Sequence, residues 1–277
     1  MNDLEKPPLF EVRGVTFAYP GRPPSLEEVS FTVGKGERLA LLGANGSGKT
    51  TLLLLLDGLY FPNKGRIQFE GDPIEAQTLE GGEVGRAFRR QVGLLFQNPD
   101  AQLFSPSVEE ELSFAPRQLG LPPEEAAERV ESVLTLMEIS SLRNRPPQSL
   151  SAGEKKRVAL ASLLTAGPSV LLLDEPTAGL DPRSQSRLLD ILEQLHEAGL
   201  TLVSATHELL LLPHLADRAV VLSPDHRLVA DAKAEAVLAD LPLLDGANLI
   251  HVHRHRHGNV LHRHPHLHWA GHHHGDH

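Results

Sequence analysis

The segment GANGSGKT at residues 43–50 constrains this chain more than any other, because it fits the pattern G-x-x-x-x-G-K-[ST] at every fixed position. It follows the apolar run LALL and opens the run TLLLLL, so it is predicted to join a strand to a helix. Glycines let the backbone approach phosphate oxygens, and the first helical turn adds positive charge. The sequence therefore predicts a phosphate-binding loop. The residues expected to contact the nucleotide are Gly43, Ala44, Asn45, Gly46, Ser47, Gly48, Lys49, Thr50 and Thr51.

A second motif, VLLLDEPT at residues 170–177, supplies acidic groups for the same chemistry. Its apolar run is predicted to be a strand that delivers Asp174 toward Mg²⁺, beside the hydroxyl of Thr50. Glu175 follows, where a carboxylate can orient or deprotonate an attacking water. Lys49 is expected to contact the β- and γ-phosphates. Together the two motifs indicate Mg²⁺-dependent nucleotide hydrolysis without naming a family.

Short, largely apolar runs alternate with helical patterns along most of the chain. Such runs are typical of strands buried on both faces of a parallel sheet. They occur at residues 39–42, 170–173 and 202–205. Residues 127–137 and 188–195 repeat apolar side chains at spacings of three and four, as helices do. The pair Pro122-Pro123 ahead of the first pattern suits a helix start. The alternation predicts an α/β fold with ligands at the carboxyl ends of the strands, and residues 10–33 are expected to form an antiparallel strand pair.

Composition excludes several classes of protein. Lys and Arg number 26 against 36 Asp and Glu, a net charge of −10, which argues against a nucleic-acid partner. No cysteine is present, so disulfides, thiolate metal sites and cysteine nucleophiles are excluded. The longest aliphatic run, residues 52–56, is far shorter than the roughly 20 residues that span a bilayer, and no signal segment opens the sequence. We therefore expect a soluble, cytoplasmic protein.

The segment LSAGEKKRVALA at residues 150–161 resembles the signature of ATP-binding cassette (ABC) ATPases. Further along, Asp181 in AGLD resembles the D-loop of that family and is expected at the nucleotide. The resemblance covers about residues 9–245 and implies a phosphate-loop NTPase of ABC type that binds ATP. That fold has a RecA-like core, an antiparallel β subdomain and a helical subdomain, here expected at about residues 98–149, within an ATPase domain of residues 1–245.

The resemblance also assigns roles to single residues. Tyr19 is expected to stack on adenine, and His207 matches the switch histidine that reaches the γ-phosphate. Gln97 falls where the family has a glutamine that touches Mg²⁺ and couples to a membrane partner. Ser151 and Gly153 correspond to signature residues that donate to the γ-phosphate from the opposite subunit.

The signature departs from the usual LSGGQ at two positions, where Ala152 replaces glycine and Glu154 replaces glutamine. Alanine adds a methyl group and loses the freedom to adopt positive φ. We expect a modest effect, because the base Glu175 and the switch histidine His207 are both present.

The family mechanism implies specific partners. Each phosphate loop is completed by the signature of a second subunit, so a chain with one cassette is expected to form a C2 homodimer or to pair with a second ABC ATPase. Separate transmembrane coupling and substrate-capture subunits are implied, which would place the chain peripherally at the cytoplasmic face of the cell membrane. No nucleic acid is expected as a partner.

The segments FQNPDAQLF and VEEELSFAP, at residues 96–104 and 108–116, resemble the cobalt and nickel branch of the energy-coupling factor importers. The resemblance implies an ATPase subunit that energises nickel or cobalt import. Two alternatives remain open at this point. One is the ATPase of an energy-coupling factor vitamin importer, and the other is a metal-storage protein whose nucleotide site gates metal release.

Histidines concentrate at the C-terminus, where 12 of the 16 lie from His251 onward. Two sets of four alternate with other residues: His251, His253, His255 and His257, and then His262, His264, His266 and His268. In an extended segment, alternate residues lie on the same face, so each set of four would share one face. Imidazole sets suit Ni²⁺, Zn²⁺ and, less tightly, Co²⁺. A purification tag and a functionless solvated tail are the plainer alternatives, and buffering, delivery and sensing of metal are not distinguished. Residues 246–277 are thus predicted to be a flexible metal-binding tail, with candidate ligands His251, His253, His255, His257, His262, His264, His266, His268, His272, His273 and His274.

Overall fold

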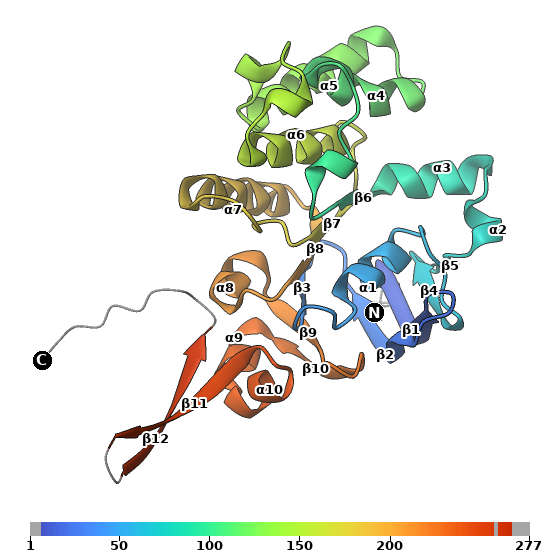
Figure 1. Cartoon of the computed structure of the whole chain (residues 1–277). Helices are drawn as coiled ribbons and strands as arrows, with labels where there is room; N and C mark the ends of the chain where they lie inside the picture. Colours follow the sequence, from blue (N-terminus) through green and yellow to red (C-terminus); the bar gives the residue numbers. More distant parts are fainter. Residues whose placement is uncertain (1–6, 258–259, 268–277) are drawn as a thin grey trace, which may run out of the picture.

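The computed structural model describes residues 7–257 and 260–267, and its central layer is a six-stranded sheet with strand order β10-β9-β3-β8-β7-β6 (Figure 1). Five strands run parallel to one another, in the order β6, β7, β8, β3 and β9, and β10 pairs antiparallel with β9 at the edge of the sheet. Three apolar runs of the sequence form β3, β7 and β8, so the predicted α/β fold is confirmed. The strands are β3 (Arg38–Leu42), β6 (Val92–Leu95), β7 (Val170–Asp174), β8 (Thr201–Thr206), β9 (Arg218–Leu222) and β10 (Leu228–Lys233).

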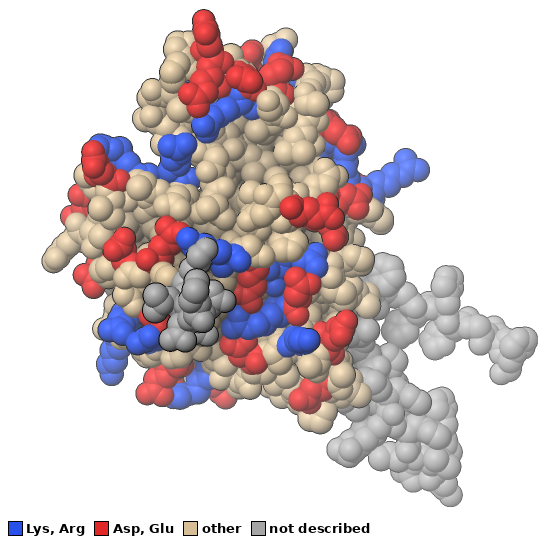
Figure 2. Space-filling model, turned by 180° about the vertical axis from the view of Figure 1, so that it is seen from behind, with Lys and Arg blue, Asp and Glu red and all other residues tan. Residues whose placement is uncertain are grey.

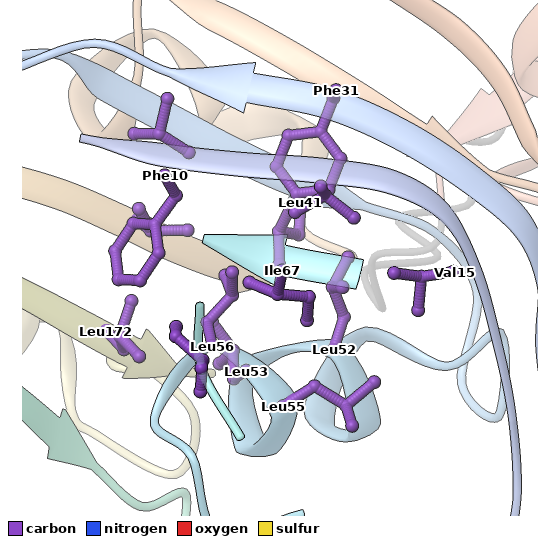
Figure 3. Packing of buried hydrophobic residues seen from close by; sticks show 14 of the residues in the cluster. Phe10, Val15, Phe31, Leu41, Leu52, Leu53, Leu55, Leu56, Ile67 and Leu172 are labelled. Carbon is purple, nitrogen blue, oxygen red and sulfur yellow. The ribbon is translucent and has the colours of Figure 1, made fainter. Parts of the chain in front are cut away.

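A second sheet, with strand order β2-β1-β4-β5, is antiparallel throughout. Helix α1 (Lys49–Leu56) carries four fully buried leucines, and these share one hydrophobic cluster with residues of both sheets, such as Phe10 and Leu172 (Figure 3). A helix that is apolar almost all round must be covered on every side, so the leucine run fixes α1 between the two sheets. The strands are β1 (Phe10–Ala18), β2 (Pro24–Val33), β4 (Lys64–Phe69) and β5 (Asp72–Pro73).

The opposite face of the central sheet is covered by α6 (Ala152–Leu164) and α7 (Pro182–Glu197). Successive residues of a strand point to opposite faces. In β7, Leu172 accordingly joins the cluster around α1, whereas Leu171 and Leu173 join a second cluster with buried residues of α6 and α7. This double coverage explains why the strand is an uninterrupted apolar run.

A group of helices lies at one end of the molecule, in the region expected for a helical subdomain (Figure 1). There α4 (Val108–Gln118) and α5 (Pro123–Leu136) pack against α6. Helix α5 begins at a proline, as the pair Pro122-Pro123 indicated. The remaining short elements are α2 (Ala76–Leu79), α3 (Gly82–Gln91), α8 (Leu212–Leu215), α9 (Ala234–Ala239) and α10 (Leu241–Gly246), with 3₁₀ turns η1 (Pro99–Ala101), η2 (Ser140–Leu142), η3 (Pro147–Ser149) and η4 (Leu209–Leu211).

The packed body continues past the boundary expected at residue 245. Leu249 and Ile250 are buried in a third cluster, together with Leu42 of β3 and residues of α9 and α10. From there the chain forms an antiparallel two-stranded ribbon of β11 (Ile250–His257) and β12 (Val260–Leu267). The flexible metal-binding tail expected at residues 246–277 stays a prediction. The tail histidines His268, His272, His273 and His274 lie outside the described residues.

Acidic and basic side chains are interspersed over the face shown in Figure 2. A surface that tracks a phosphate backbone requires a basic stripe instead, so the charge on this face does not favour nucleic acid. In the part of the chain that the structure describes, no helix has both the length and the apolar character needed to cross a bilayer.

Asp57, at the C-terminal end of α1, is a partly buried carboxyl with a strongly raised pKa. Burial raises its pKa to about 7, partly offset by Arg89. Since the folded pKa exceeds the ordinary value of 3.8, the contribution of Asp57 to stability falls as the pH rises from about 4 to about 7. Asp57→Asn removes the charge that is costly to bury, so its stabilising effect should be about 2–3 kcal/mol larger at pH 8 than at pH 5. Urea unfolding at both pH values measures this.

Asp72→Asn, at an exposed position on β5, is the control for losing one negative charge. An equal effect of Asp57→Asn at pH 5 and pH 8 would contradict the assignment of a raised pKa.

Candidate nucleotide site

The loop between β3 and α1 passes so close to its neighbours that two positions require glycine. Gly48 has φ +107°, and a Cβ there would lie 2.4 Å from the carbonyl oxygen of Ser25. A Cβ on Gly43 would lie 2.4 Å from the hydroxyl oxygen of Ser47, which is buried and has no hydrogen-bond partner among the described residues. Asn45 and Gly46 are exposed. The loop therefore offers backbone amides and one spare hydroxyl, as a phosphate cradle requires.

Lys49, the first residue of α1, is folded over this loop. Its Nζ donates hydrogen bonds to the carbonyl oxygens of Gly43 at 2.8 Å and Ala44 at 3.2 Å, and it lies 3.5 Å from Glu175 Oε1. Burial lowers the pKa of Lys49, and the carboxylate of Glu175 opposes that shift. The ammonium group is thus held between the loop and a carboxylate, where it can exchange these contacts for phosphate oxygens.

Asp174, the last residue of β7, accepts a hydrogen bond from Thr50 Oγ1 at 2.9 Å. Burial raises the pKa of Asp174, while the hydrogen bond from Thr50 lowers it. The two residues are 124 positions apart in the sequence, and the parallel pairing of β7 with β8 and of β8 with β3 brings them together. A hydroxyl and a carboxylate are oxygen ligands of the kind that Mg²⁺ prefers, so this pair fits the metal that accompanies a nucleotide.

Glu175 lies at the junction of three elements, directly after β7. Its Oε1 is 2.8 Å from Nδ1 of His207, which follows β8, and the same oxygen lies 3.5 Å from Nζ of Lys49. Its Oε2 is buried and has no hydrogen-bond partner in the described part of the chain. Its backbone has φ +45°, a conformation that non-glycine residues rarely adopt and that clusters at functional sites. One carboxylate oxygen is therefore anchored and the other is left free to accept a proton.

The signature segment begins α6 with a capping box. Ser151 Oγ accepts a hydrogen bond from the backbone N–H of Glu154, whose Oε2 accepts one from the N–H of Ser151 at 2.8 Å. The backbone hydrogen bond from Ser151 lowers the pKa of Glu154. Glutamate at this position therefore performs the capping role that glutamine also supports. Ala152 is the first helical residue, so it needs no positive φ and alanine costs nothing there.

Gly153 of α6 and Asp181, which precedes α7, both lie against Ser184 of α7. A Cβ on Gly153 would lie 2.7 Å from Oγ of Ser184, so glycine permits this close approach. Asp181 caps α7, because its side chain accepts hydrogen bonds from the N–H groups of Arg183 and Ser184. Hydrogen bonds from Ser184 also lower the pKa of Asp181. The signature and D-loop residues are thus neighbours within one chain.

Lys156 was not predicted from the sequence, yet it connects two parts of the site. It is 2% exposed, and its Nζ donates to the carbonyl oxygen of Gln97 at 2.7 Å and to that of Glu175 at 3.3 Å. Burial lowers its pKa to about 8. The adjacent Lys155 pairs with Asp100 at 2.6 Å. The signature helix therefore holds the backbone of the glutamine segment and that of the catalytic glutamate candidate in fixed positions.

Tyr19 follows β1 and contacts the start of α1. Its Oη lies 3.2 Å from Oγ1 of the buried Thr51, and its ring packs edge-on against Phe17 and Tyr60. Tyr60 was not predicted, although it is half-exposed and adds a second ring to this surface. A partly buried Tyr19 with the exposed Tyr60 beside it offers aromatic surface near the phosphate loop that can stack on a base.

The predicted site residues fall into two groups. In the described chain, no hydrogen bond joins a residue of one group directly to a residue of the other. Lys49, Thr50, Asp174, Glu175 and His207 form one cluster through direct contacts. Ser151, Gly153 and Asp181 form the other, and Gln97 is exposed, with only its backbone carbonyl held. The first group, at the carboxyl ends of β3, β7 and β8, defines a phosphate-loop nucleotide hydrolase.

Comparison with known proteins identifies the family. The family model of ABC transporters matches residues 26–178. The nickel import ATP-binding protein NikO of Rhodobacter capsulatus is 48% identical over 246 residues, which cover 88% of this chain and 96% of that protein. The energy-coupling factor transporter ATP-binding protein EcfA of Methanocaldococcus jannaschii is 40% identical over 241 residues, covering 87% of this chain and 85% of that protein.

A solved structure agrees with these relatives. The structure of cbiO1 from Clostridium perfringens, described as part of the ABC transporter complex cbiONQ, is 34% identical, has a TM-score of 0.76 and covers 87% of this chain and 95% of that one. The chain therefore belongs to the ABC transporter family. It is an ATPase whose domain binds ATP and Mg²⁺, and the resemblance identified in the sequence is confirmed.

Lys156→Met removes both hydrogen bonds to the site backbone and keeps an unbranched side chain. Because displacement of a catalytic group by about 1 Å can cost 10²-fold in rate, kcat should fall about 10–100-fold. The Kd for ATP should stay within roughly threefold, since Lys156 does not touch the phosphate loop. Steady-state ATPase assays and nucleotide titration measure the two quantities.

Lys155→Met is the matched control, because it removes only a surface ion pair worth about 0–1 kcal/mol. Equal kcat values for the two variants would show that Lys156 does not position the site.

Proposed function

We propose that this chain is the ATP-hydrolysing subunit that energises a nickel or cobalt importer. The observation that carries the ATPase part is the anchored carboxylate of Glu175, with its free buried Oε2, beside the phosphate loop. The metal part rests on the 48% identity to a nickel import ATP-binding protein, of which this chain covers nearly the whole length. The likeness to cbiO1 of a cbiONQ complex supports the same class.

The chain's own residues account for binding and activation. Backbone amides of the phosphate loop and the ammonium of Lys49 hold the phosphates of ATP. Thr50 and Asp174 are the residues that hold Mg²⁺, with Gln97 brought to it from the exposed glutamine segment. The bound Mg²⁺ supplies positive charge that neutralises the β- and γ-phosphates.

Glu175 is the group that takes the proton of the attacking water. Its Oε1 is occupied by His207 at 2.8 Å, so Oε2 is the oxygen free to accept that proton. The water oxygen bonds to the γ-phosphorus as the bond to the bridging β–γ oxygen breaks. His207 orients the carboxylate and reaches the γ-phosphate on its other side. Tyr19, with Tyr60 beside it, stacks on the adenine.

A second chain completes the site. Ser151 is exposed at the N-terminal end of α6, and the positive end of a helix dipole attracts an anion. In a C2 dimer, Ser151 and Gly153 of one chain reach the γ-phosphate bound by the other, and Asp181 lies beside them at the interface. ATP then favours the closed dimer and hydrolysis releases it. Separate transmembrane subunits convert this cycle into transport, with the ATPase held peripherally at the cytoplasmic face of the membrane.

Uptake of labelled Ni²⁺ and Co²⁺ by cells that lack this chain tests the proposal. The intact chain should restore uptake of one or both ions, and Glu175→Gln should not, because it cannot take the proton of the attacking water. Glu197→Gln, at an exposed position on α7, is the matched control and should restore uptake fully. Metal uptake that does not change when the chain is deleted would contradict metal import and favour import of a vitamin.

A further inference from the structure

The C-terminal ribbon places histidines opposite one another on its two strands. The register pairs His251 with His266, His253 with His264, and His255 with His262. Residues directly opposite in an antiparallel pair share a face, and so do alternate residues along a strand. One face of the ribbon therefore carries seven histidines, whereas Val252, Arg254, Arg256, Leu261, Arg263 and Pro265 share the other.

We propose that the histidine face of the ribbon formed by β11 and β12 binds divalent transition-metal ions through cross-strand histidine pairs. Opposite Cα atoms in such a ribbon lie about 4.5–5.5 Å apart, and metal–imidazole bonds are about 2.0–2.1 Å long, so one ion can be shared by two opposed residues. Imidazole suits Ni²⁺, Cu²⁺ and Zn²⁺ rather than Mg²⁺. The arginines on the other face stay protonated and offer no ligand atoms.

The first residue of the ribbon is buried in the packed body of the protein. Ile250, the first residue of β11, is 2% exposed and belongs to the hydrophobic cluster that includes Leu42, the residue before the phosphate loop. The N–H of Leu249 donates a hydrogen bond to the carbonyl oxygen of Leu244 in α10. One end of the ribbon is therefore fixed, which reduces the entropy lost when the two strands are held together by a metal ion.

The sequence of the ribbon allows the two strands to pair, but it also contains a destabilising contact that a bound ligand would offset. Pro265 is tolerated because both strands of a two-stranded ribbon are edge strands. Arg254 lies opposite Arg263, and like charges in opposed positions destabilise a strand pair. Metal on the histidine face would offset that cost, since a ligand that binds the paired state stabilises it.

Larger groups of metal-ligating side chains are absent from the part of the chain whose side chains the structure describes. Among residues whose side chains the structure describes, no group of three His, Asp or Glu side chains could hold a metal ion. The proposal rests on the ribbon's register and composition and is independent of the transport function. If the ribbon does not bind metal, the proposed ATPase role is unaffected. If the ATPase role fails, the metal-binding proposal is likewise unaffected.

Titration of the full-length protein with NiCl₂ in excess Mg²⁺, followed by calorimetry, tests the proposal. The first variant, His251→Ala with His253→Ala and His255→Ala, removes one member of each pair. The second exchanges neighbours in β11, with His253→Arg, Arg254→His, His255→Arg and Arg256→His. It keeps every residue count and moves two histidines to the other face.

Both variants should weaken Ni²⁺ binding by roughly tenfold or more, because even outer partners of a metal site contribute 10–100-fold to affinity. Basal ATPase activity should be unchanged in both, which shows that the body is folded. Wild-type affinity in the exchanged variant would mean that histidine number rather than register controls binding, and would overturn the proposal. Wild-type affinity in the alanine variant would also overturn it, because the ribbon would then not be the site.

Discussion

The buried ion pair between Glu175 and Lys49, in which His207 contacts the same carboxylate oxygen, is the interaction on which the rest of the site depends. A buried charge is costly unless it is paired and hydrogen-bonded. The three residues come from the ends of three parallel elements, so the site exists only when the sheet is assembled. The sheet in turn requires α1 to be buried between two layers, which its leucine run ensures.

Lys156 extends this network to the exposed glutamine segment. One ammonium group holds the backbone carbonyl oxygens of Gln97 and Glu175, so a displacement of the glutamine segment would shift the backbone that carries the Glu175 carboxylate. In the proposed transporter Gln97 couples to the membrane partner, and Lys156 would then connect that contact to hydrolysis.

Features that depend on local sequence were predicted well. The phosphate loop, the strand ending at Asp174 and the start of α5 at Pro123 all follow from spacing and backbone preference. Features that depend on tertiary contacts were not. Lys156 resembles any charged residue on a helix until its neighbours are known, and the burial of Ile250 cannot be inferred from a segment that ends in histidines. The capping role of Glu154 could have been predicted, because Ser-x-x-Glu before an apolar run is a recognised helix start.

ATP binding, turnover and association state, measured together for Glu175→Gln, test the role of this carboxylate most directly. We expect ATP affinity within roughly threefold of wild type and turnover lower by about 10²–10⁴-fold, as for loss of a general base. We also expect a dimer in sedimentation experiments when Mg²⁺ and ATP are present. Turnover at the wild-type rate would contradict the role of Glu175. A variant that binds ATP but remains monomeric would contradict a site completed by a second chain.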